Sequence, residues 1–267
     1  MILRFYKYQG TGNDFILIDN RSFVLRNHID YTNIIANLCN RRFGIGADGL
    51  ILINKSDEAD FAMQYFNSDG KEGTMCGNGG RCSVAFVNYL GIIKEKTTFI
   101  AIDGLHEAII CNKEKDTTLV SLKMKEINNV EKYDQGYILD TGSPHYVCFK
   151  ENAESIDVYN EGKKIRNNTK FFKKGVNVDF ATIYKDYIYV RTYERGVEAE
   201  TLSCGTGAVA TAIAASISDN ENKNNEFTLI TKGGKLYVHF DKISKTLFTD
   251  IWLKGNVTNV FKGDINI

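Results

Sequence analysis

The sequence predicts an α+β protein made of two similar, pseudo-symmetric domains, each with a β-rich sheet and one central helix. Three observations support this prediction. Strand patterns dominate the chain, one apolar or small-residue helix lies near the middle of each half, and the same eight-residue motif precedes both helices. A length of 267 residues fits one large domain or two of ordinary size.

The shared motif is E-x-x-x-C-G-x-G, which occurs once in each half of the chain. Its first copy runs from Glu72 to Gly79 and its second from Glu200 to Gly207. In both copies a strand-like segment ending in a turn comes before the motif, and a helix-like segment follows it. The same pattern in the same structural context indicates an internal duplication.

Hydrophobic periodicity gives the order of the elements. In the first half, strand patterns alternate with two helices, of which the second is stopped by Gly91. The second half has a long hairpin, a helix of alanine and serine that suits a fully enclosed position, and a hairpin across Gly233 and Gly234. The expected strands are 2–10, 14–22, 49–56, 59–70, 97–103, 107–113, 117–124, 136–143, 145–150, 175–195 as a hairpin, and 226–240 as a hairpin; the expected helices are 30–43, 81–91 and 207–218.

Composition points to a soluble protein that acts on a small molecule. The 33 basic and 33 acidic residues give no net charge, which does not favour a nucleic-acid or membrane-surface partner. The first residues are too polar for a signal peptide, and no apolar run approaches the roughly 20 residues that span a bilayer. We therefore expect a cytoplasmic protein.

The six cysteines do not have the spacing of a disulfide framework or a zinc site. No C-x-x-C pair occurs, the four histidines are scattered, and a reducing compartment disfavours disulfides. We expect no bound metal. Gly44, Gly46 and Gly49 spell G-x-G-x-x-G, but a helix is expected before them and a strand after, the reverse of a dinucleotide site.

The repeated cysteines, Cys76 and Cys204, are the candidate acid and base of an epimerase. A cysteine at a helix N-terminus meets unpaired amides and a positive dipole end, which stabilise a thiolate and can hold a substrate carboxylate. Two similar domains that face each other would bring one thiol to each side of a ligand. One thiolate could then remove an α-proton while the other thiol delivers a proton to the opposite face. No lysine stands in a setting typical of pyridoxal phosphate, so we expect no cofactor.

At these residues the chain resembles the diaminopimelate epimerase family. The resemblance covers nearly the whole sequence and is carried in order by FYKYQGTGNDF, FGIGADG, NSDGKEGTMCGNGGRC, TGSPHYV, GVNVDF and YERGVEAETLSCGTGA. It implies interconversion of LL- and meso-diaminopimelate, on the route to lysine and cell-wall peptide, without pyridoxal phosphate or metal. It also implies that Cys76 and Cys204 are the acid–base pair.

The resemblance assigns further roles residue by residue. His145 and Glu194 match side chains that tune the thiols, and Arg195 suits a bidentate clamp on a carboxylate. The positions that match substrate-binding residues of the family are Asn13, Asn67, Gly77, Asn78, Asn177, Glu194, Arg195, Gly205 and Thr206.

Three departures from the family pattern concern the distal end of the substrate. Ser143 stands where asparagine is frequent, and Gly49 stands where glutamine is frequent. The loop before Cys204 has one more residue between Gly196 and Glu200 than the commonest pattern. Each change shortens, removes or reshapes a contact that the resemblance implies.

The resemblance also implies that each domain wraps a β-rich antiparallel sheet or barrel around its helix. The expected domains are 1–117, carrying Cys76 and completed by about 254–267, and 118–253, carrying Cys204. A homodimer is expected from the family. The alternatives are a related amino-acid racemase on the same scaffold, for example for histidine, a non-catalytic amino-acid-binding protein and, more distantly, a redox sensor that uses the cysteine pair.

Overall fold

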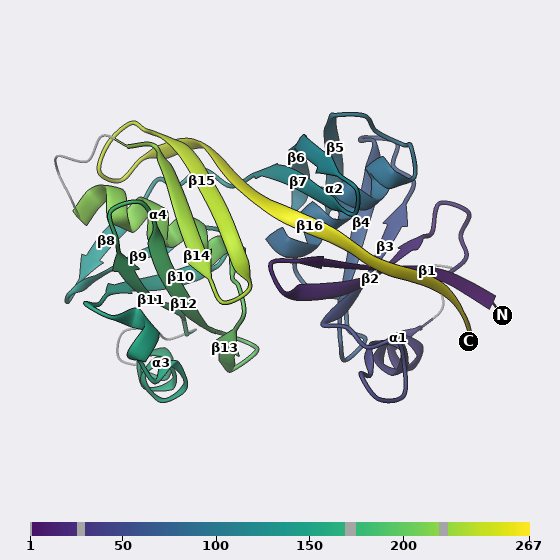
Figure 1. Ribbon diagram of the computed structural model, residues 1–267, viewed down its shortest axis with the longest axis horizontal. Helices are drawn as coiled ribbons and strands as arrows, with labels where there is room; N and C mark the ends of the chain where they lie inside the picture. The colour runs from purple at the N-terminus through teal and green to yellow at the C-terminus, as the bar shows by residue number, and fades with distance from the viewer. Residues whose placement is uncertain (1, 26–29, 169–174, 219–223) are drawn as a thin grey trace. The chain divides into compact units, whose positions relative to one another are not determined.

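The computed structural model describes residues 2–25, 30–168, 175–218 and 224–267. The chain divides into two compact units (Figure 1). The first comprises Met1–Leu122 and Gly255–Ile267, and the second comprises Lys123–Lys254.

The first unit is a sheet of seven strands joined by two helices and completed by the end of the chain. Its elements are β1 (Ile2–Gly10), β2 (Asn13–Asp19), α1 (Thr32–Cys39), β3 (Gly49–Asn54), β4 (Phe61–Asn67), α2 (Gly77–Tyr89), β5 (Lys96–Ala101), β6 (Gly104–Glu114), β7 (Thr117–Lys123) and the last part of β16 (Phe248–Asn266).

Strand pairing closes this first sheet on itself. The strands follow one another in chain order from β1 to β7, and the last part of β16 pairs with both β7 and β1. Most neighbours are antiparallel, but β2–β3 and β4–β5 are parallel because α1 and α2 connect them as crossovers. A closed sheet leaves no strand edge unpaired.

The second unit repeats this plan. Its elements are β8 (Val130–Tyr133), β9 (Gly136–Asp140), β10 (Pro144–Phe149), η1 (Ala153–Ser155), α3 (Val158–Arg166), β11 (Asn177–Ile183), β12 (Ile188–Glu194), β13 (Ala199–Thr201), α4 (Gly205–Ser218), β14 (Glu226–Thr231), β15 (Gly234–Lys242) and the first part of β16.

The two parallel pairs of the second unit lie at the positions that the duplication predicts. β10–β11 are joined through α3, and β12–β14 are joined through α4, as α1 and α2 join their strands in the first unit. The pairs β8–β9, β9–β10, β11–β12, β12–β13 and β14–β15 are antiparallel. Both halves of the chain therefore fold by the same strand–helix–strand sequence.

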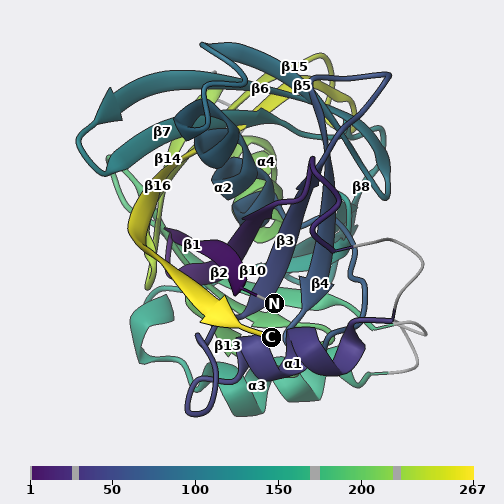
Figure 2. The same ribbon diagram turned by 90° about the vertical axis from the view of Figure 1, so that its right-hand side faces the viewer.

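One helix occupies the middle of each unit. In the first unit α2 contacts β1, β2, β3, β4 and β6, and Figure 2 shows it enclosed by these strands. In the second unit α4 contacts β9, β10, β11, β12, β14 and β15. The alanines at 208, 210, 212 and 214 are fully buried. Small side chains allow the sheet to approach the helix closely on every side.

The sequence predicted most of these elements. The structure confirms the helix that follows each copy of the cysteine motif and the two hairpins of the second half. It also confirms that the first of these helices ends before Gly91, where φ is +73°. α3 was not predicted because VYNEGKKIR is polar over most of its length. In the described ranges, no helix is both long and apolar enough to cross a membrane.

Candidate active site

Cys76 is the N-cap residue of α2. Its φ of −110° and ψ of 123° are extended, and its carbonyl oxygen accepts a hydrogen bond from the Gly80 amide at 2.7 Å. The amides of the first helical turn, beginning at Gly77 and Asn78, therefore follow the thiol directly. This is the position that the glycine-rich motif predicts, and it offers backbone donors to an anion.

Asn13, at the first position of β2, is the side chain that contacts the Cys76 thiol. Cys76 Sγ donates to Asn13 Oδ1 at 3.6 Å, and Asn78 Nδ2 donates to the same oxygen at 3.3 Å. Asn13 follows a tight turn in which Thr11 and Gly12 have positive φ values of 51° and 86°. Asn13, Cys76, Gly77 and Asn78, which were all predicted site residues, therefore lie together.

The segment that contains Gly44, Gly46 and Gly49 holds Asn13 in place. Asp48 Oδ2 accepts a hydrogen bond from Asn13 Nδ2 at 2.7 Å. The order of α1 before this segment and β3 after it is confirmed, so it has no dinucleotide-site topology. This segment contributes the Asp48 carboxylate, which binds the amide nitrogen of the Asn13 side chain.

Asp48 belongs to a small network of charges. Arg41 Nη2 contacts Asp48 Oδ1 at 2.7 Å and Asp14 Oδ1 at 2.6 Å, while buried Lys7 contacts Asp14 Oδ2 at 2.7 Å. Burial works to raise the pKa of Asp14, but the hydrogen bonds from Arg41 and Lys7 outweigh it and hold that pKa well below its usual range. Asp14 is therefore ionised at neutral pH.

Arg81, in the second turn of α2, is a fully buried cation that sequence reasoning missed. Its Nη2 donates to Asn78 Oδ1 at 2.8 Å and to Thr11 Oγ1 at 3.2 Å. Among the residues that the structure describes, no carboxylate forms an ion pair with it. Burial lowers the pKa of Arg81, while the Cys82 and Cys76 sulfurs act in the opposite direction. The charge of this buried cation is therefore available to attract an anion at this end of α2.

Asn67 lies at the end of β4, where a turn leads toward the first cysteine motif. The backbone of Asn67 pairs with Lys71 and Gly70, and Gly70 has a φ of +83°. Its side-chain nitrogen approaches Gly73 so closely that a Cβ atom there would lie 2.9 Å away. Asn67 is exposed, and these contacts connect it to the loop before Cys76.

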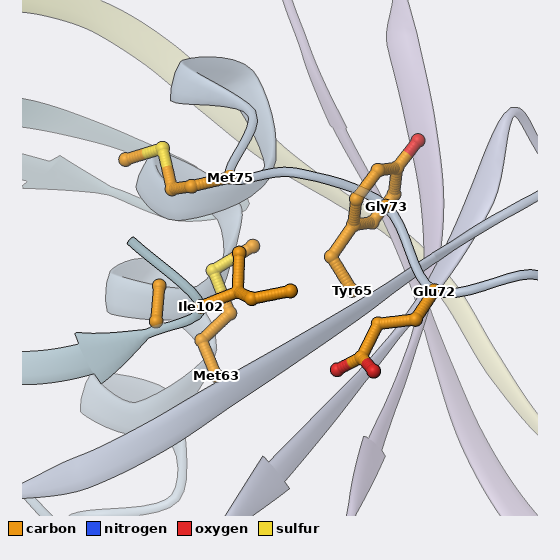
Figure 3. Close-up of a pocket in the computed structure, with 7 residues that line it drawn as sticks. Met63, Tyr65, Glu72, Gly73, Met75 and Ile102 are labelled. Carbon is orange, nitrogen blue, oxygen red and sulfur yellow. The ribbon is translucent and has the colours of Figure 1, made fainter. Parts of the chain in front are cut away.

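A small cavity lies beside this loop (Figure 3). Its volume of about 10 Å³ holds roughly one water molecule, so it does not accommodate an amino acid. Figure 3 shows the Tyr65 ring beside Gly73. A Cβ at Gly49 would lie 2.5 Å from Tyr65 Cε2, so this tyrosine fills the space where a larger residue at 49 would stand.

Cys204 occupies the corresponding place in the second unit, directly before Gly205, the first residue of α4. Its carbonyl oxygen accepts from the Ala208 amide at 2.9 Å, and its Sγ lies 3.3 Å from Thr206 Oγ1. Burial raises the pKa of the Cys204 thiol well above its usual value, and the Glu194 carboxylate raises it further. The hydrogen bond from Thr206 acts in the opposite direction, but Cys204 is held as a thiol at neutral pH.

Glu194, the last residue of β12, lies beside Cys204. Its Oε1 accepts a hydrogen bond from Thr201 Oγ1 at 2.6 Å. Burial raises the pKa of Glu194, while the hydrogen bonds from Thr201 and Cys204 and the nearby His145 ring partly offset this effect. Glu194, which was predicted to lie near a thiol, is therefore beside Cys204. Thr201, which was not predicted, binds it.

His145 is buried under the start of α4. Its Nδ1 lies 2.7 Å from Asp179 Oδ2, and its Nε2 lies 2.9 Å from Thr206 Oγ1 and 3.1 Å from Ser143 Oγ. Both His145 and Asp179 side chains are completely inaccessible to solvent. His145 is therefore a buried residue of strand β10 that is held at both ring nitrogens.

Asn177, at the start of β11, connects Ser143 with Arg195. Its Nδ2 donates to Ser143 Oγ at 2.9 Å, and its Oδ1 accepts from the backbone amide of Arg195 at 2.8 Å. Arg195 is exposed, and its backbone amide links it to Asn177. Ser143 is therefore part of the His145 environment as well as a departure from the family pattern.

The sequence missed Asp48, Arg81, Asp179 and Thr201. A signal for Asp179 was present, because Asn177 and Asp179 are two apart on one strand and therefore share a face. Ser143 and His145 on β10, and Thr192 and Glu194 on β12, have the same spacing on neighbouring strands. His145 pairs with Asn177, and Asp179 pairs with Thr192. Polar residues at period two inside an apolar sheet indicate a buried site.

The glutamates of the repeated motif do not join the thiols. Glu72 accepts from Gln64 at 3.2 Å, whereas Glu200 binds Arg191 Nε at 2.6 Å and Lys232 Nζ at 2.9 Å. They anchor the loops that lead to the two cysteines. Within the described ranges, no group of three or more His, Cys, Asp and Glu side chains is arranged to hold a metal ion.

Comparison with known proteins finds relatives over nearly the full chain. The family model described as diaminopimelate epimerase matches residues 5–128 and again residues 137–258. The chain is 51% identical to a diaminopimelate epimerase of Flavobacterium psychrophilum, over 98% of this chain and 100% of that protein. It is 39% identical to one of Chlorobaculum tepidum, over 97% and 99%.

A solved structure supports the fold independently. The crystal structure of a PhzF-family phenazine biosynthesis protein from Bacillus anthracis superposes with a TM-score of 0.77, covers 100% of both chains and has 14% sequence identity. At this identity the likeness concerns the fold alone. The two matches to the family model, one per repeat, together with the full-length relatives, show that this chain belongs to the diaminopimelate epimerase family.

Proposed function

We propose that this protein interconverts LL- and meso-diaminopimelate, with Cys76 and Cys204 as the paired acid and base. The observation that carries the proposal is the position of each cysteine. Each directly precedes the first residue of a buried helix in its own repeat, where backbone amides accompany the thiol. The family membership, at 51% identity over nearly the whole chain, supports the substrate.

The reaction exchanges one proton on each face of the α-carbon. A thiolate removes the α-proton, and the second thiol gives its proton to the opposite face, so that the two cysteines exchange protonation states in each turnover. The negative charge that develops next to the substrate carboxylate is stabilised by helix-end donors, as at Gly77 and Asn78 or at Gly205 and Thr206. The positive charge of Arg81 adds to this stabilisation at the first helix.

The resting protonation states follow from the surroundings of the two thiols. Burial and the Glu194 carboxylate favour the thiol form of Cys204, whereas the buried Arg81 cation favours an anion at the Cys76 end of α2. We propose that Cys204 is the resting acid and Cys76 the resting base. In the reverse reaction, Cys204 is the base and Cys76 is the acid.

Substrate selection is proposed to rest on Asn13, Asn67, Asn177 and Arg195. An asparagine can both donate and accept hydrogen bonds, as an ammonium group and a carboxylate require, and Arg195 can bind a carboxylate with two parallel bonds. Asn177 and Arg195 are linked in the second unit, which supports a common role. A homodimer, as in the family expectation, is part of the proposal and is tested by light scattering of the purified protein.

The test of substrate and cofactor independence is direct. Reduced protein is incubated with LL-diaminopimelate, a metal chelator and no pyridoxal phosphate, and the products are separated by chiral chromatography. We expect an equilibrium mixture that contains the meso form. Conversion of histidine or another amino acid, but not of diaminopimelate, would show that the protein is a racemase with a different substrate on the same fold. Folded protein that converts none of them would contradict the epimerase proposal and favour a binding protein.

A further inference from the structure

The loop between β12 and β13 carries Arg195, the proposed carboxylate clamp. This 195–198 loop follows Glu194, the last residue of β12, and is closed by a hydrogen bond from the Glu198 amide to the Glu194 carbonyl oxygen at 2.8 Å. Gly196 and Glu198 have positive φ values of 93° and 56°. The left-handed conformation is unfavourable for a residue with a Cβ atom, so Glu198 keeps it only because other contacts hold the loop.

The Glu198 carboxylate is the centre of these contacts. Its Oε1 accepts hydrogen bonds from the Gly196 amide at 3.0 Å and from Arg166 Nη2 at 2.9 Å. Its Oε2 accepts from the Tyr193 hydroxyl at 3.4 Å. One side chain therefore joins the backbone of the loop to strand β12 and to helix α3. The amide that it binds belongs to the residue directly after Arg195.

Helix α3 brings Arg166 to this carboxylate. Gly162 packs against the buried Tyr193, because a Cβ on Gly162 would lie 2.5 Å from the Tyr193 Cβ. Arg166 is four residues later and therefore on the same face of the helix. Its guanidinium also lies against Gly175, where a Cβ would be 1.9 Å from Nη1. With its side chain only 21% exposed, Arg166 is held between the start of β11 and the loop.

Two attachments thus meet at the backbone of Arg195. Its own amide donates to Asn177 Oδ1 at 2.8 Å, and the next amide, that of Gly196, donates to Glu198. The additional residue of this chain lies between Gly196 and Glu200, in the stretch that contains Glu198. The added length does not leave the loop loose, because a charged side chain within it binds the backbone of the loop.

We propose that Glu198 and Arg166 are positioning residues that hold the backbone of Arg195 in place for the carboxylate at the distal, non-reacting end of the substrate. The inference rests on the proposed function, since that function supplies the substrate. Contacts to the distal end are the same in the ground state and the transition state, so their loss raises KM and leaves kcat nearly unchanged. A contact that served only the stability of the fold would change thermal unfolding without this split.

The test compares Glu198→Ala, Glu198→Gln and Arg166→Met with a matched control, Lys164→Met. Lys164 is exposed on α3, so the control removes a positive charge from the same helix. Steady-state kinetics with LL-diaminopimelate measure KM and kcat separately. Hydrogen exchange of the peptide that contains residues 195–198, followed by mass spectrometry, measures the order of the loop without substrate. Thermal unfolding checks that each variant is folded.

We expect Glu198→Ala to raise KM by about 10-fold, the effect of losing one hydrogen bond to a charged group, with kcat within about twofold of the wild type. Glu198→Gln keeps an acceptor for the Gly196 amide, so its KM should rise less. Arg166→Met should also raise KM, and the loop amides should exchange faster in both Glu198→Ala and Arg166→Met. Lys164→Met should match the wild type in both measurements.

A wild-type KM in folded Glu198→Ala, or a fall in kcat at constant KM, would overturn the positioning role. If Glu198→Ala does not fold, Arg166→Met carries the same test, because it leaves the loop sequence intact. Failure of the wild type to convert diaminopimelate would instead count against the proposed function. The exchange rates of the loop amides would still show whether Glu198 and Arg166 hold the loop, since they are measured without substrate.

Discussion

Asp48 binds the amide nitrogen of Asn13 at 2.7 Å, which turns the oxygen of the same amide toward the Cys76 thiol at 3.6 Å. An asparagine amide has a donor end and an acceptor end, and a carboxylate partner selects between them. The charged network of Lys7, Asp14, Arg41 and Asp48 thus fixes the direction of a neutral side chain at the candidate active site.

Replacing Asp48 by alanine should therefore lower kcat/KM by about 10- to 100-fold, because Asn13 loses a hydrogen bond to a charged partner that orients it. Steady-state kinetics and thermal unfolding measure the two effects separately. Asp264→Asn is the control, since Asp264 pairs with Arg4 at the surface of the same unit, where solvent screens such pairs. Equal activity of Asp48→Ala and Asp264→Asn would contradict the positioning role.

Arg81→Met should weaken the anion-binding character of the Cys76 site. The buried cation has no carboxylate partner among the described residues, so its loss removes positive charge close to the thiol. We expect the rate at which iodoacetamide alkylates Cys76, relative to exposed Cys111, to fall several-fold at neutral pH and turnover to fall with it. Arg81→Lys keeps the charge and should retain more of the rate than Arg81→Met. A Cys76 rate equal to the wild type in folded Arg81→Met would refute this role.

Glu194 makes stability depend on pH in a defined direction. Burial raises its pKa in the folded protein above the ordinary value of 4.5, so the folded state binds the proton more tightly than the unfolded state. Its contribution to stability is present below pH 4.5 and is lost as the pH rises through the folded pKa. Glu194→Gln should remove this loss, and the variant should be more stable than the wild type at neutral pH but less active. Urea unfolding at several pH values measures the difference, and identical profiles for the two proteins would contradict it.

Much of the fold could be predicted because its elements have simple local signals. The alternation of GVNVDFATI and the small-residue run of α4 determine their structure locally. α3 and the three-residue β13 lack such signals. The return of β16 to the first unit is a long-range pairing, and only the family resemblance predicted it.

The site was predicted in part for a related reason. Glycine-flanked cysteines indicate helix starts in the sequence itself, so Cys76 and Cys204 could be found. The period-two spacing of polar residues places Asp179 on a buried face, but its contact with His145 on the neighbouring strand depends on the register of β10 and β11, which no local pattern gives. Arg81 was hidden because arginine in a helix is ordinarily exposed, whereas here it is fully buried.

Cys76→Ala and Cys204→Ala should each reduce epimerisation by about 100- to 10,000-fold or more, because each removes a proton donor or acceptor. Neither change should unfold the protein, since both thiols are only partly buried and stand at helix starts rather than within the core. Circular dichroism and chiral chromatography test the two parts of this prediction. Substantial turnover by the double variant would exclude the two-thiol mechanism.

Deuterium incorporation from deuterium oxide shows whether the two thiols exchange the α-proton of the substrate. Wild-type protein, Cys76→Ala and Cys204→Ala are each incubated with LL-diaminopimelate, and NMR follows the α-proton while chiral chromatography follows configuration. The two-thiol account predicts meso product with deuterium at the inverted carbon for the wild type, and no inversion for either variant. Inversion at the wild-type rate after loss of either thiol, or meso product that keeps the original α-proton, would contradict it.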